Sequence, residues 1–300
     1  MKVGAIVFDV DNTLTPPRAP IREEMAEVLC RLDPVFHLAA GSDLKLVMEQ
    51  LVEPLAEYGF EGRFDAFVCN GADRYRCLVR GGEVEVQPVS RFALRDHLGE
   101  TAFDALLRSV SILLNEREFC LEASGVPVRG EQIINRGSMI NVVPMGRPAQ
   151  MDAEAYAQRA AFVEFDRRTG YRLRLLERLR TLIAPWQASH GLRVTLGGQT
   201  SFDIVVEGHD KRFPLRALLS EGVQRILYFG DALHPEGNDR AVLEFIDEWA
   251  GVGNCPVEAV AVENWEDTRC KLLNRRLVRE EPLVAKGRVA RSFDGSAHRR

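Results

Sequence analysis

The sequence predicts an α/β protein in which a doubly wound parallel sheet forms the core and a smaller α+β domain is inserted into it. Short apolar segments typical of strands alternate with amphipathic helical segments over residues 3–73, and a matching strand segment returns at 225–232. Between about 88 and 206 the pattern changes to helices and to strands suited to an antiparallel sheet. Alternation of strands and helices is typical of a parallel sheet covered on both faces.

The first segments alternate in the order strand, helix, strand, helix, strand. Residues 3–10 form a short β-branched run bounded by charge, as expected of a strand buried on both faces. Residues 21–32 place their apolar side chains on one face, which indicates an amphipathic helix. The next three segments are predicted as a strand at 35–44, a helix at 44–59 that closes with Gly59, and a strand at 64–73.

The middle of the chain has the pattern of a second domain. A helix is predicted at 92–114 and another at 154–183, broken or bent near Gly170. Segments 132–146 and 192–208 are typical of strands. We therefore expect three parts, namely a core of residues 1–87 and 207–274, an inserted α+β domain of 88–206, and a basic tail of 275–300.

The composition is that of a soluble globular protein, with 46% hydrophobic and 28% charged residues. The net charge of −5 gives no general nucleic-acid footprint, so we expect neither a nucleic-acid nor a membrane partner. Residues 275–300 carry eight Lys and Arg against three Asp and Glu, without apolar periodicity. A solvated, poorly ordered terminus is expected there.

The cysteines indicate a reducing compartment. There are six of them, scattered and without a CxxC pair, which favours reduced thiols, no zinc site and a cytoplasmic location. The start of the chain is unlike a signal peptide, because acidic residues interrupt its apolar run. No segment approaches the apolar length of a membrane span.

Two aspartates, Asp9 and Asp11, stand where the first buried strand ends. Like charges this close raise each other's pKa, so the pair needs positive charge or a shared proton. Ligands bind at the carboxyl ends of strands in an open parallel sheet, where Ser42 and Asp231 also follow strands. Lys211 follows the return from the inserted domain. Converging carboxylates suit Mg²⁺, with one aspartate attacking phosphorus and the other moving protons.

Each of these residues also has a simpler interpretation when it is taken alone. Ser42 is well placed to cap the helix that follows it, and Lys211 would ordinarily be a surface lysine. Asp231 and Asp239 could be turn residues. The arginines of the inserted domain could be solvated side chains of helices or strands.

The motifs taken together resemble those of a known superfamily. DxDxT after a strand, a Ser after the next strand, a Lys, and GD…ND are similar to the four motifs of the haloacid-dehalogenase (HAD) phosphotransferases. Over residues 3–273 the chain further resembles the α-phosphomannomutase family of eukaryotic type, whose inserted cap domain is of class IIB. The matching segments, in order, are AAGSDLKLVMEQL, HLGE, SMINVVPMGR, GGQTSFDIVVEGHDKR, GDALHPEGND and EDTR.

The resemblance implies a role for each acidic residue of the motifs. Asp9 would be the nucleophile that becomes an aspartyl phosphate, and Asp11 would be the general acid/base for the sugar hydroxyl. Mg²⁺ would be held by Asp9, by the main-chain carbonyl of Asp11 and by Asp231. Asp239 is a further candidate metal ligand, and a turn residue is the equal alternative for it.

The resemblance also implies how phosphate and sugar would be bound. Ser42 and Lys211 would hold the transferring phosphoryl group. A sugar bisphosphate needs a second grip on its distal phosphate, and planar guanidinium groups suit that task. Matching the third cap arginine requires a short insertion before its helix. The residues implied in substrate binding are Arg18, Arg136, Arg147, Arg159, Ser201 and Asp203.

The sequence departs from the family pattern in three places. Asn12 stands in the first motif where the family usually has Gly, and Asn tolerates the required turn dihedrals better than most residues. The fourth-motif loop has Ala232, Leu233 and His234 in place of the family's residues, which could alter secondary metal binding. Residues 115–131 look unlike the family and could reshape the cap.

The leading prediction is a phosphomannomutase that interconverts mannose 6-phosphate and mannose 1-phosphate, with Mg²⁺ as cofactor and hexose 1,6-bisphosphate as activator. A sugar-phosphate phosphatase on the same scaffold is the alternative, since water need only replace the sugar hydroxyl. A catalytically silent sugar-phosphate sensor or interaction subunit is the third hypothesis, and the intact acidic and lysine motifs count against it. The resemblance also suggests a homodimer through the cap.

Overall fold

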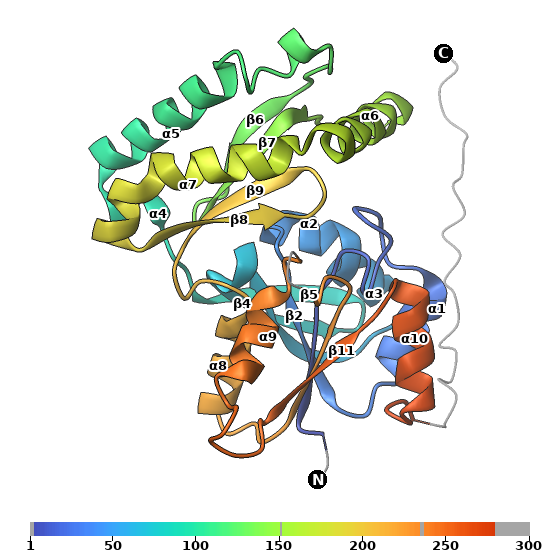
Figure 1. Cartoon of the computed structure of the whole chain (residues 1–300). Coiled ribbons are helices and arrows are strands. Elements are labelled where there is room, and N and C mark those ends of the chain that lie inside the picture. The colour runs from blue at the N-terminus through green and yellow to red at the C-terminus, as the bar shows by residue number, and fades with distance from the viewer. Residues whose placement is uncertain (1–2, 151, 235–236, 280–300) are drawn as a thin grey trace, which may run out of the picture.

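The computed structural model describes residues 3–150, 152–234 and 237–279. Figure 1 shows two parts, a core built on a seven-stranded sheet and a cap above it built on a four-stranded sheet. The cap comes from the stretch of chain between β5 (Glu83–Ser90) and α8 (Arg212–Ser220), so it is inserted into the core. The predicted α/β core with an inserted α+β domain is confirmed.

The core sheet has the strand order β11-β10-β1-β2-β3-β4-β5. Its first five strands run parallel, whereas β4 and β5 continue the sheet antiparallel. The core sheet extends to Ser90, a little past the expected boundary at residue 87. The strands are β1 (Ala5–Phe8), β2 (Val35–Ala39), β3 (Gly62–Val68), β4 (Asp73–Arg80), β5, β10 (Ile226–Gly230) and β11 (Val257–Ala261).

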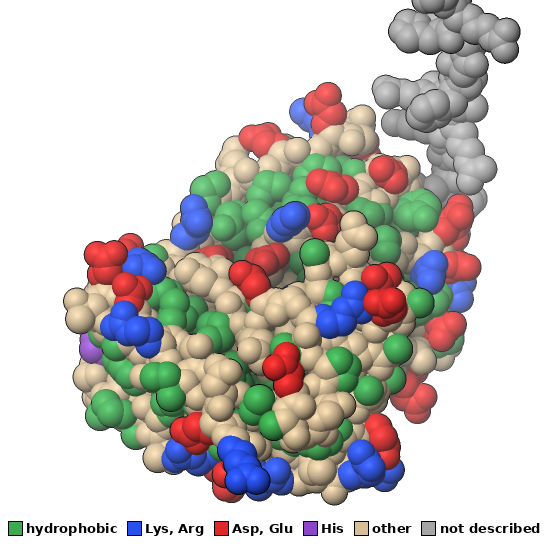
Figure 2. All heavy atoms as spheres, turned by 90° about the horizontal axis from the view of Figure 1, so that it is seen from above, with side chains coloured by type: hydrophobic (Ala, Val, Ile, Leu, Met, Phe, Trp, Pro, Cys, Tyr) green, Lys and Arg blue, Asp and Glu red, His purple; other side chains and the backbone are tan. Residues whose placement is uncertain are grey.

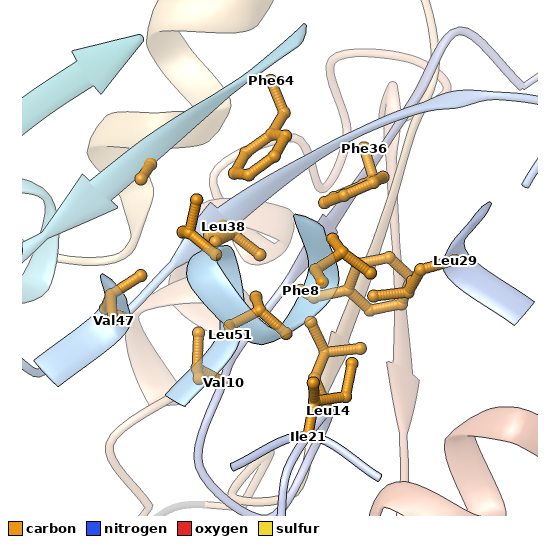
Figure 3. Packing of buried hydrophobic residues seen from close by; sticks show 14 of the residues in the cluster. Phe8, Val10, Leu14, Ile21, Leu29, Phe36, Leu38, Val47, Leu51 and Phe64 are labelled. Atoms are coloured by element: carbon orange, nitrogen blue, oxygen red, sulfur yellow. The ribbon is translucent and has the colours of Figure 1, made fainter. Parts of the chain in front are cut away.

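Helices cover both faces of this sheet, because side chains of a strand alternate between its faces. Ile6 and Phe8 of β1 belong to a cluster with the α1–α3 and α10 side, and Val7 belongs to a cluster with α8 and α9. Figure 3 shows Phe8, Leu38 and Leu51 converging in the first cluster. The helices are α1 (Glu23–Cys30), α2 (Leu44–Val47), η1 (Met48–Val52), α3 (Glu53–Glu57), α8, α9 (Arg240–Asp247) and α10 (Trp265–Asn274).

Several predicted core elements differ in detail. The helix expected at 44–59 is one helical run, but a π-helical turn, η1, separates α2 from α3. The strand expected at 35–44 ends at Ala39, which leaves a loop that carries Gly41 and Ser42. β3 ends at Val68 and is followed by a short 3₁₀ turn, η2 (Cys69–Gly71), instead of continuing to residue 73.

The cap sheet has the order β6-β7-β9-β8 and is antiparallel throughout. Segments 132–146 and 192–208, each predicted as a strand, are each a hairpin. The helix predicted at 154–183 breaks at Gly170, where φ is +63°, and that at 92–114 breaks at Gly99. The elements are α4 (Leu94–Leu98), α5 (Glu100–Asn115), η3 (Glu122–Ser124), β6 (Glu131–Asn135), β7 (Ile140–Arg147), α6 (Ala153–Thr169), α7 (Tyr171–His190), β8 (Leu192–Gly197) and β9 (Ser201–Val206).

The start of the basic tail is packed on the core. Val278 forms an antiparallel bridge with Leu32, and the Arg279 amide donates to the Arg31 carbonyl at 2.9 Å. The expectation of disorder is therefore wrong for residues 275–279, whose backbone continues the α10 side of the core. Residues 280–300 lie outside the described part of the chain.

All six cysteines are free thiols. Among the residues that the structure describes, no helix is both long enough and apolar enough to cross a membrane. The cysteines lie in both the core and the cap, and Cys69 and Cys77 are buried.

A buried charge cluster beside β2 makes the stability of the core pH-dependent. The His37 ring accepts a hydrogen bond at Nδ1 from the Asp65 amide at 3.2 Å, which requires that nitrogen to be unprotonated. Burial lowers the pKa of His37 to about 4, although the neighbouring carboxylates of Asp65 and Glu221 oppose the shift and Arg74 and Arg76 support it. The ring is therefore neutral in the folded chain near pH 5, whereas it is protonated in the unfolded chain.

We expect the free energy of unfolding to fall as the pH drops from about 6.5 toward 4, because the unfolded chain binds a proton there that the folded chain does not. His37 should account for about 1–2 kcal/mol of the fall in the free energy of unfolding between pH 7 and pH 5. Urea unfolding at the two pH values measures it. His37→Gln should show a smaller fall than the wild type, and an unchanged fall would contradict this role of His37.

Candidate active site

A cavity of about 540 Å³ lies between the core and the cap, at the carboxyl ends of β1, β2 and β10. This is where ligands bind in open parallel sheets. Side chains from both domains line it. The predicted site residues on its wall are Asp9, Asp11, Arg18, Ser42, Arg136, Arg147, Arg159, Ser201, Asp203 and Asp231.

Asp9, Lys211 and Asp239 form the buried floor of the site. The Lys211 ammonium donates to Asp9 Oδ1 at 2.6 Å and to Asp239 Oδ1. Tyr228 also donates to Asp239 Oδ1, at 2.7 Å, and the Ala232 amide donates to its other oxygen. Lys211 and Asp239 are at most 1% exposed and do not line the cavity, whereas Asp9, to which Lys211 is bonded, does.

The floor of the site holds more carboxylates than cations. Burial raises the pKa of Asp9 to about 8; the Lys211 ammonium opposes that rise, whereas the charges of Asp239 and Asp231 add to it. The pKa of Asp231 is also raised, chiefly by burial. Burial disfavours the charge on Lys211, but Asp239 and Asp9 outweigh it and raise the lysine's pKa. One ammonium thus serves three carboxylates, and further positive charge would stabilise them.

Three of these carboxylates could hold a metal ion. Oxygens of Asp9, Asp231 and Asp239 lie within 4.8 Å of one another. Carboxylate oxygens suit Mg²⁺, which binds through one or two of them and keeps water in its other positions. Asp239 accepts three hydrogen bonds over its two oxygens. Asp9 Oδ2 receives only a long one from the Thr13 hydroxyl at 3.4 Å, and Asp231 accepts one from Asn12, so Asp9 and Asp231 have the more available oxygens. The donor set therefore fits Mg²⁺, with Asp239 better placed to hold Lys211 than to bind the ion.

The Asp11 carboxylate is not part of that acidic group among the described residues. Its Oδ1 instead accepts hydrogen bonds from the Arg18 amide at 2.8 Å and from Gln50 Nε2 at 2.9 Å. The side chain is half-buried and lines the cavity. The Asp11 carboxylate therefore lies apart from the three carboxylates that could hold a metal ion, and the predicted metal role of Asp11 would fall to its main-chain carbonyl.

Asn12 connects the first motif to the fourth. Its φ is +64°, in the left-handed region, which explains why glycine or asparagine is needed at this turn. Its side-chain amide donates to Asp231 Oδ2 at 2.9 Å and to the Glu263 carbonyl at 3.1 Å. The departure from glycine therefore adds a hydrogen bond that orients Asp231.

The predicted arginines converge on the cavity from the loop after β1 and from the cap. Arg147 donates to Asn141 Oδ1 at 2.7 Å, and Arg159 to Gln199 Oε1 at 3.1 Å. Burial lowers the pKa of Arg147 to about 9, and the charges of Arg18 and Arg136 lower it further. Burial likewise lowers the pKa of Arg159. Cations crowded in this way favour the binding of an anion.

Two of the predicted substrate residues also bridge the cap and the core. Arg136 of the cap donates from Nη1 to the Gly41 carbonyl at 2.7 Å. Asp203 of β9 accepts from Asn70 Nδ2 of the core at 3.0 Å and from Asn141 Nδ2 at 2.6 Å. Asn70 has a φ of +58°, so the core backbone turns sharply at this contact. Ser201 lines the cavity nearby, and its hydroxyl donates to the Gly197 carbonyl.

A fifth arginine of the cavity, Arg172, was not predicted. It donates to the Gly198 carbonyl at 2.7 Å and to the Ser201 carbonyl at 3.0 Å, which fixes the loop between β8 and β9. Its Nε is buried and has no partner among the described residues. Arg172 could have been singled out in the sequence by its place in the first turn of α7, where the helix dipole disfavours a cation.

Comparisons with known proteins show the family of the chain. A family model described as eukaryotic phosphomannomutase matches residues 25–272. Human phosphomannomutase 1 is 32% identical over 240 residues, which cover 78% of this chain and 80% of that protein. Phosphomannomutase of Schizosaccharomyces pombe is 33% identical over 248 residues, covering 81% of this chain and 85% of its own.

Solved structures share the fold at low sequence identity. An IMP-bound mutant of Plasmodium falciparum IMP-nucleotidase has a TM-score of 0.58 at 15% identity, covering 92% of this chain and 67% of that one. The C-terminal domain of C. albicans trehalose-6-phosphate phosphatase has a TM-score of 0.55 at 14% identity, covering 92% of this chain and 93% of that one. These likenesses show the fold alone.

Proposed function

The chain belongs to the eukaryotic phosphomannomutase family, and we propose that it interconverts mannose 6-phosphate and mannose 1-phosphate by passing a phosphoryl group through Asp9. One observation carries the proposal beyond family membership. A single cavity has Asp9 on its core side, with Lys211 bonded to Asp9 behind the wall, and a set of arginines on its cap side. A mutase needs both, because its bisphosphate intermediate presents one phosphate to each.

The transfer step follows from the two aspartates. The Asp9 carboxylate attacks phosphorus and the bond from phosphorus to the sugar oxygen breaks. Asp11 gives a proton to the leaving sugar oxygen, and takes one from the other hydroxyl on the return. Ser42 and Lys211 would hold the oxygens of the transferring group, with Lys211 acting from behind Asp9.

Asp9, Asp231 and the main-chain carbonyl of Asp11 would hold Mg²⁺. When bound, it offsets the negative charge of the carboxylates and of the transferring phosphoryl group. Hexose 1,6-bisphosphate would act as activator, since it phosphorylates Asp9 without a net change of the substrate pool. The cap covers the phosphoryl site and limits the access of water, which favours transfer to a sugar over hydrolysis.

The proposal is tested by ³¹P NMR of the full chain with Mg²⁺, mannose 1-phosphate and a trace of hexose 1,6-bisphosphate. A growing mannose 6-phosphate signal with little inorganic phosphate is the expected result. Inorganic phosphate growing at the expense of both esters would identify a phosphatase instead. An unchanged spectrum would remove both sugar-phosphate activities and favour the silent sensor.

Replacing Arg147 with Ala should weaken hexose-phosphate binding without slowing the chemistry at Asp9. Arg147 lies on the cap side of the cavity, and a charge-assisted contact to a distal phosphate is worth about 10–100-fold in binding. We expect KM for mannose 1-phosphate to rise by that factor. The burst of p-nitrophenol from p-nitrophenyl phosphate, which has no second phosphate, should stay the same.

Arg193→Ala is the matched control for this variant. Arg193 lies on the cap strand β8, pairs with Glu207 and does not line the cavity. It should change neither the mannose 1-phosphate KM nor the aryl phosphate burst. If Arg147→Ala impaired the reaction of mannose 1-phosphate and of p-nitrophenyl phosphate by the same factor, the role of Arg147 in holding the distal phosphate would be contradicted.

We also propose a homodimer through the cap and a cytoplasmic location. The outer face of the cap carries hydrophobic side chains among charged ones, as Figure 2 shows from above. Ile112 of α5 is 66% exposed and Leu173 of α7 is 58% exposed, which supports burial against a second copy. The free thiols support a reducing compartment. Light scattering of the purified chain measures the oligomeric state.

A further inference from the structure

One buried polar side chain reaches the loop after β1 from a helical turn whose other buried residues are apolar. Gln50 lies in the π-helical turn η1 and is 2% exposed, while its neighbours Leu51 and Val52 are buried in the core cluster. A π-helical turn is rare and occurs frequently at functional sites. Here it brings Gln50 to the loop that follows β1.

The Gln50 side chain holds one oxygen of Asp11. Its Nε2 donates to Asp11 Oδ1 at 2.9 Å, next to the Arg18 amide that donates to the same oxygen at 2.8 Å. A carboxylate only accepts hydrogen bonds, so the amide nitrogen must face it. The other end of the amide, Oε1, is buried without a partner among the described residues. An unpaired buried acceptor is unfavourable, which a purely structural glutamine would avoid.

The backbone of Gln50 holds the second donor as well. The Ile21 amide donates to the Gln50 carbonyl at 2.8 Å, which ties the loop that carries Arg18 to η1. Both hydrogen bonds on Asp11 Oδ1 therefore depend on the position of Gln50. With two donors on Oδ1, a proton carried by Asp11 must sit on Oδ2, the oxygen that receives no hydrogen bond from a described residue.

We propose that Gln50 is a positioning residue for proton transfer, which fixes the Asp11 carboxylate so that Oδ2 faces the oxygen that leaves phosphorus. This rests on the proposed function in its assignment of Asp11. In the step, the Asp9 oxygen–phosphorus bond forms, the bond from phosphorus to the leaving oxygen breaks, and the proton moves from Asp11 Oδ2 to that oxygen. Gln50 takes no part in bond making; it determines where the proton starts.

A leaving-group comparison distinguishes positioning from a structural role. Phosphorylation of Asp9 by p-nitrophenyl phosphate releases a stable anion that needs no proton, whereas release of an alkoxide needs one. Loss of Gln50 should therefore slow the first step for poor leaving groups and spare it for a good one. A general loss of structure would slow all of them alike.

The experiment measures the pre-steady-state burst of the full chain with Mg²⁺ on p-nitrophenyl phosphate, phenyl phosphate and mannose 1-phosphate. For Gln50→Met, which keeps the volume and removes the donor, we expect the mannose 1-phosphate burst to slow by about 10–100-fold. The p-nitrophenyl phosphate burst should change less than about twofold, with phenyl phosphate between the two. Asp11→Asn should slow the bursts of the three esters in the same order, and by larger factors.

Leu51→Ala is the matched control, because it perturbs the same π-helical turn without removing a donor. It should lower stability and change the three bursts by one common factor. Gln50→Asn, whose amide is one methylene too short to reach Asp11, keeps a buried amide and should repeat the leaving-group pattern of Gln50→Met. Slowing that grows as the leaving group becomes poorer, in both Gln50 variants, would support the proposal. Equal slowing of all three esters, or no slowing of any of them, would overturn it.

The outcome for Gln50 is separable from that for the proposed function. If the wild type shows a burst with both aryl esters but the ³¹P NMR assay shows no conversion of mannose 1-phosphate, the mannose phosphate activity is wrong. The contrast between p-nitrophenyl and phenyl phosphate then still decides the role of Gln50, because it depends only on the leaving group.

Discussion

The Asp9→Asn variant is expected to lose turnover of sugar phosphates while it keeps its fold. Asp9 is buried at the end of β1, and its backbone amide donates to the Phe229 carbonyl at 2.9 Å regardless of the side chain. An amide of the same shape cannot form an acyl phosphate, so we expect a loss on the order of 10⁴-fold or more, as for other enzymes that lose their nucleophile. Coupled-assay turnover and the aryl phosphate burst measure it.

The Asp9→Asn variant should still fold, because the change removes one carboxylate from a crowded group and leaves Lys211 paired with Asp239. Circular dichroism and urea unfolding test this. Asp104→Asn on the cap, where Asp104 pairs with Arg95, makes the same chemical change away from the cavity and should keep full activity. Substantial turnover by Asp9→Asn would show that another group is the nucleophile.

The Lys211→Met variant is expected to lose both stability and phosphoryl transfer. Lys211 is 1% exposed, and Asp9 and Asp239 both depend on it for a positive partner. Removing one member of a buried ion pair leaves uncompensated charge and costs about 3–5 kcal/mol. Urea unfolding should show a fall of that order, and the p-nitrophenyl phosphate burst should disappear.

A double variant separates the two effects of Lys211. Asp239→Asn in the Lys211→Met background removes one orphaned carboxylate, and the new amide can still pair with Tyr228 and the Ala232 amide. It should recover much of the lost stability but not the burst, because no cation then stands behind Asp9. Recovery of both would mean that Lys211 serves only the fold.

The fold was predictable because its strongest signals are local. The apolar run that becomes β1 and its continuation into Asp9 indicate a buried strand end, and Gly170 marks the break between α6 and α7. Segments 132–146 and 192–208 were predicted as strands of an antiparallel sheet, without a prediction of how the strands within them pair. The pairings of β6 with β7 and of β8 with β9 show that each segment folds back on itself.

The candidate site was predictable where a motif holds the residue close to a strand end. Asp9, Asp11 and Asp231 follow β1 and β10 directly. Gln50 and Arg172 were missed because both come from helices, where a single polar residue has no pattern that separates it from a solvated one. Their roles depend on one contact each with another element, Asp11 for Gln50 and the β8–β9 loop for Arg172, and such contacts are set by tertiary packing.

The two bridges between cap and core have a consequence for the order of events in a catalytic cycle. Arg136 and Asp203 use hydrogen-bonding groups to hold Gly41 and Asn70, and they also line the cavity. A ligand that bonds to Arg136 and Asp203 competes with the core for them. Ligand binding would therefore weaken the two hydrogen bonds between cap and core, which links binding to domain opening. The bisphosphate intermediate of the proposed reaction would, on taking over these groups, weaken the contacts that hold the cap on the core.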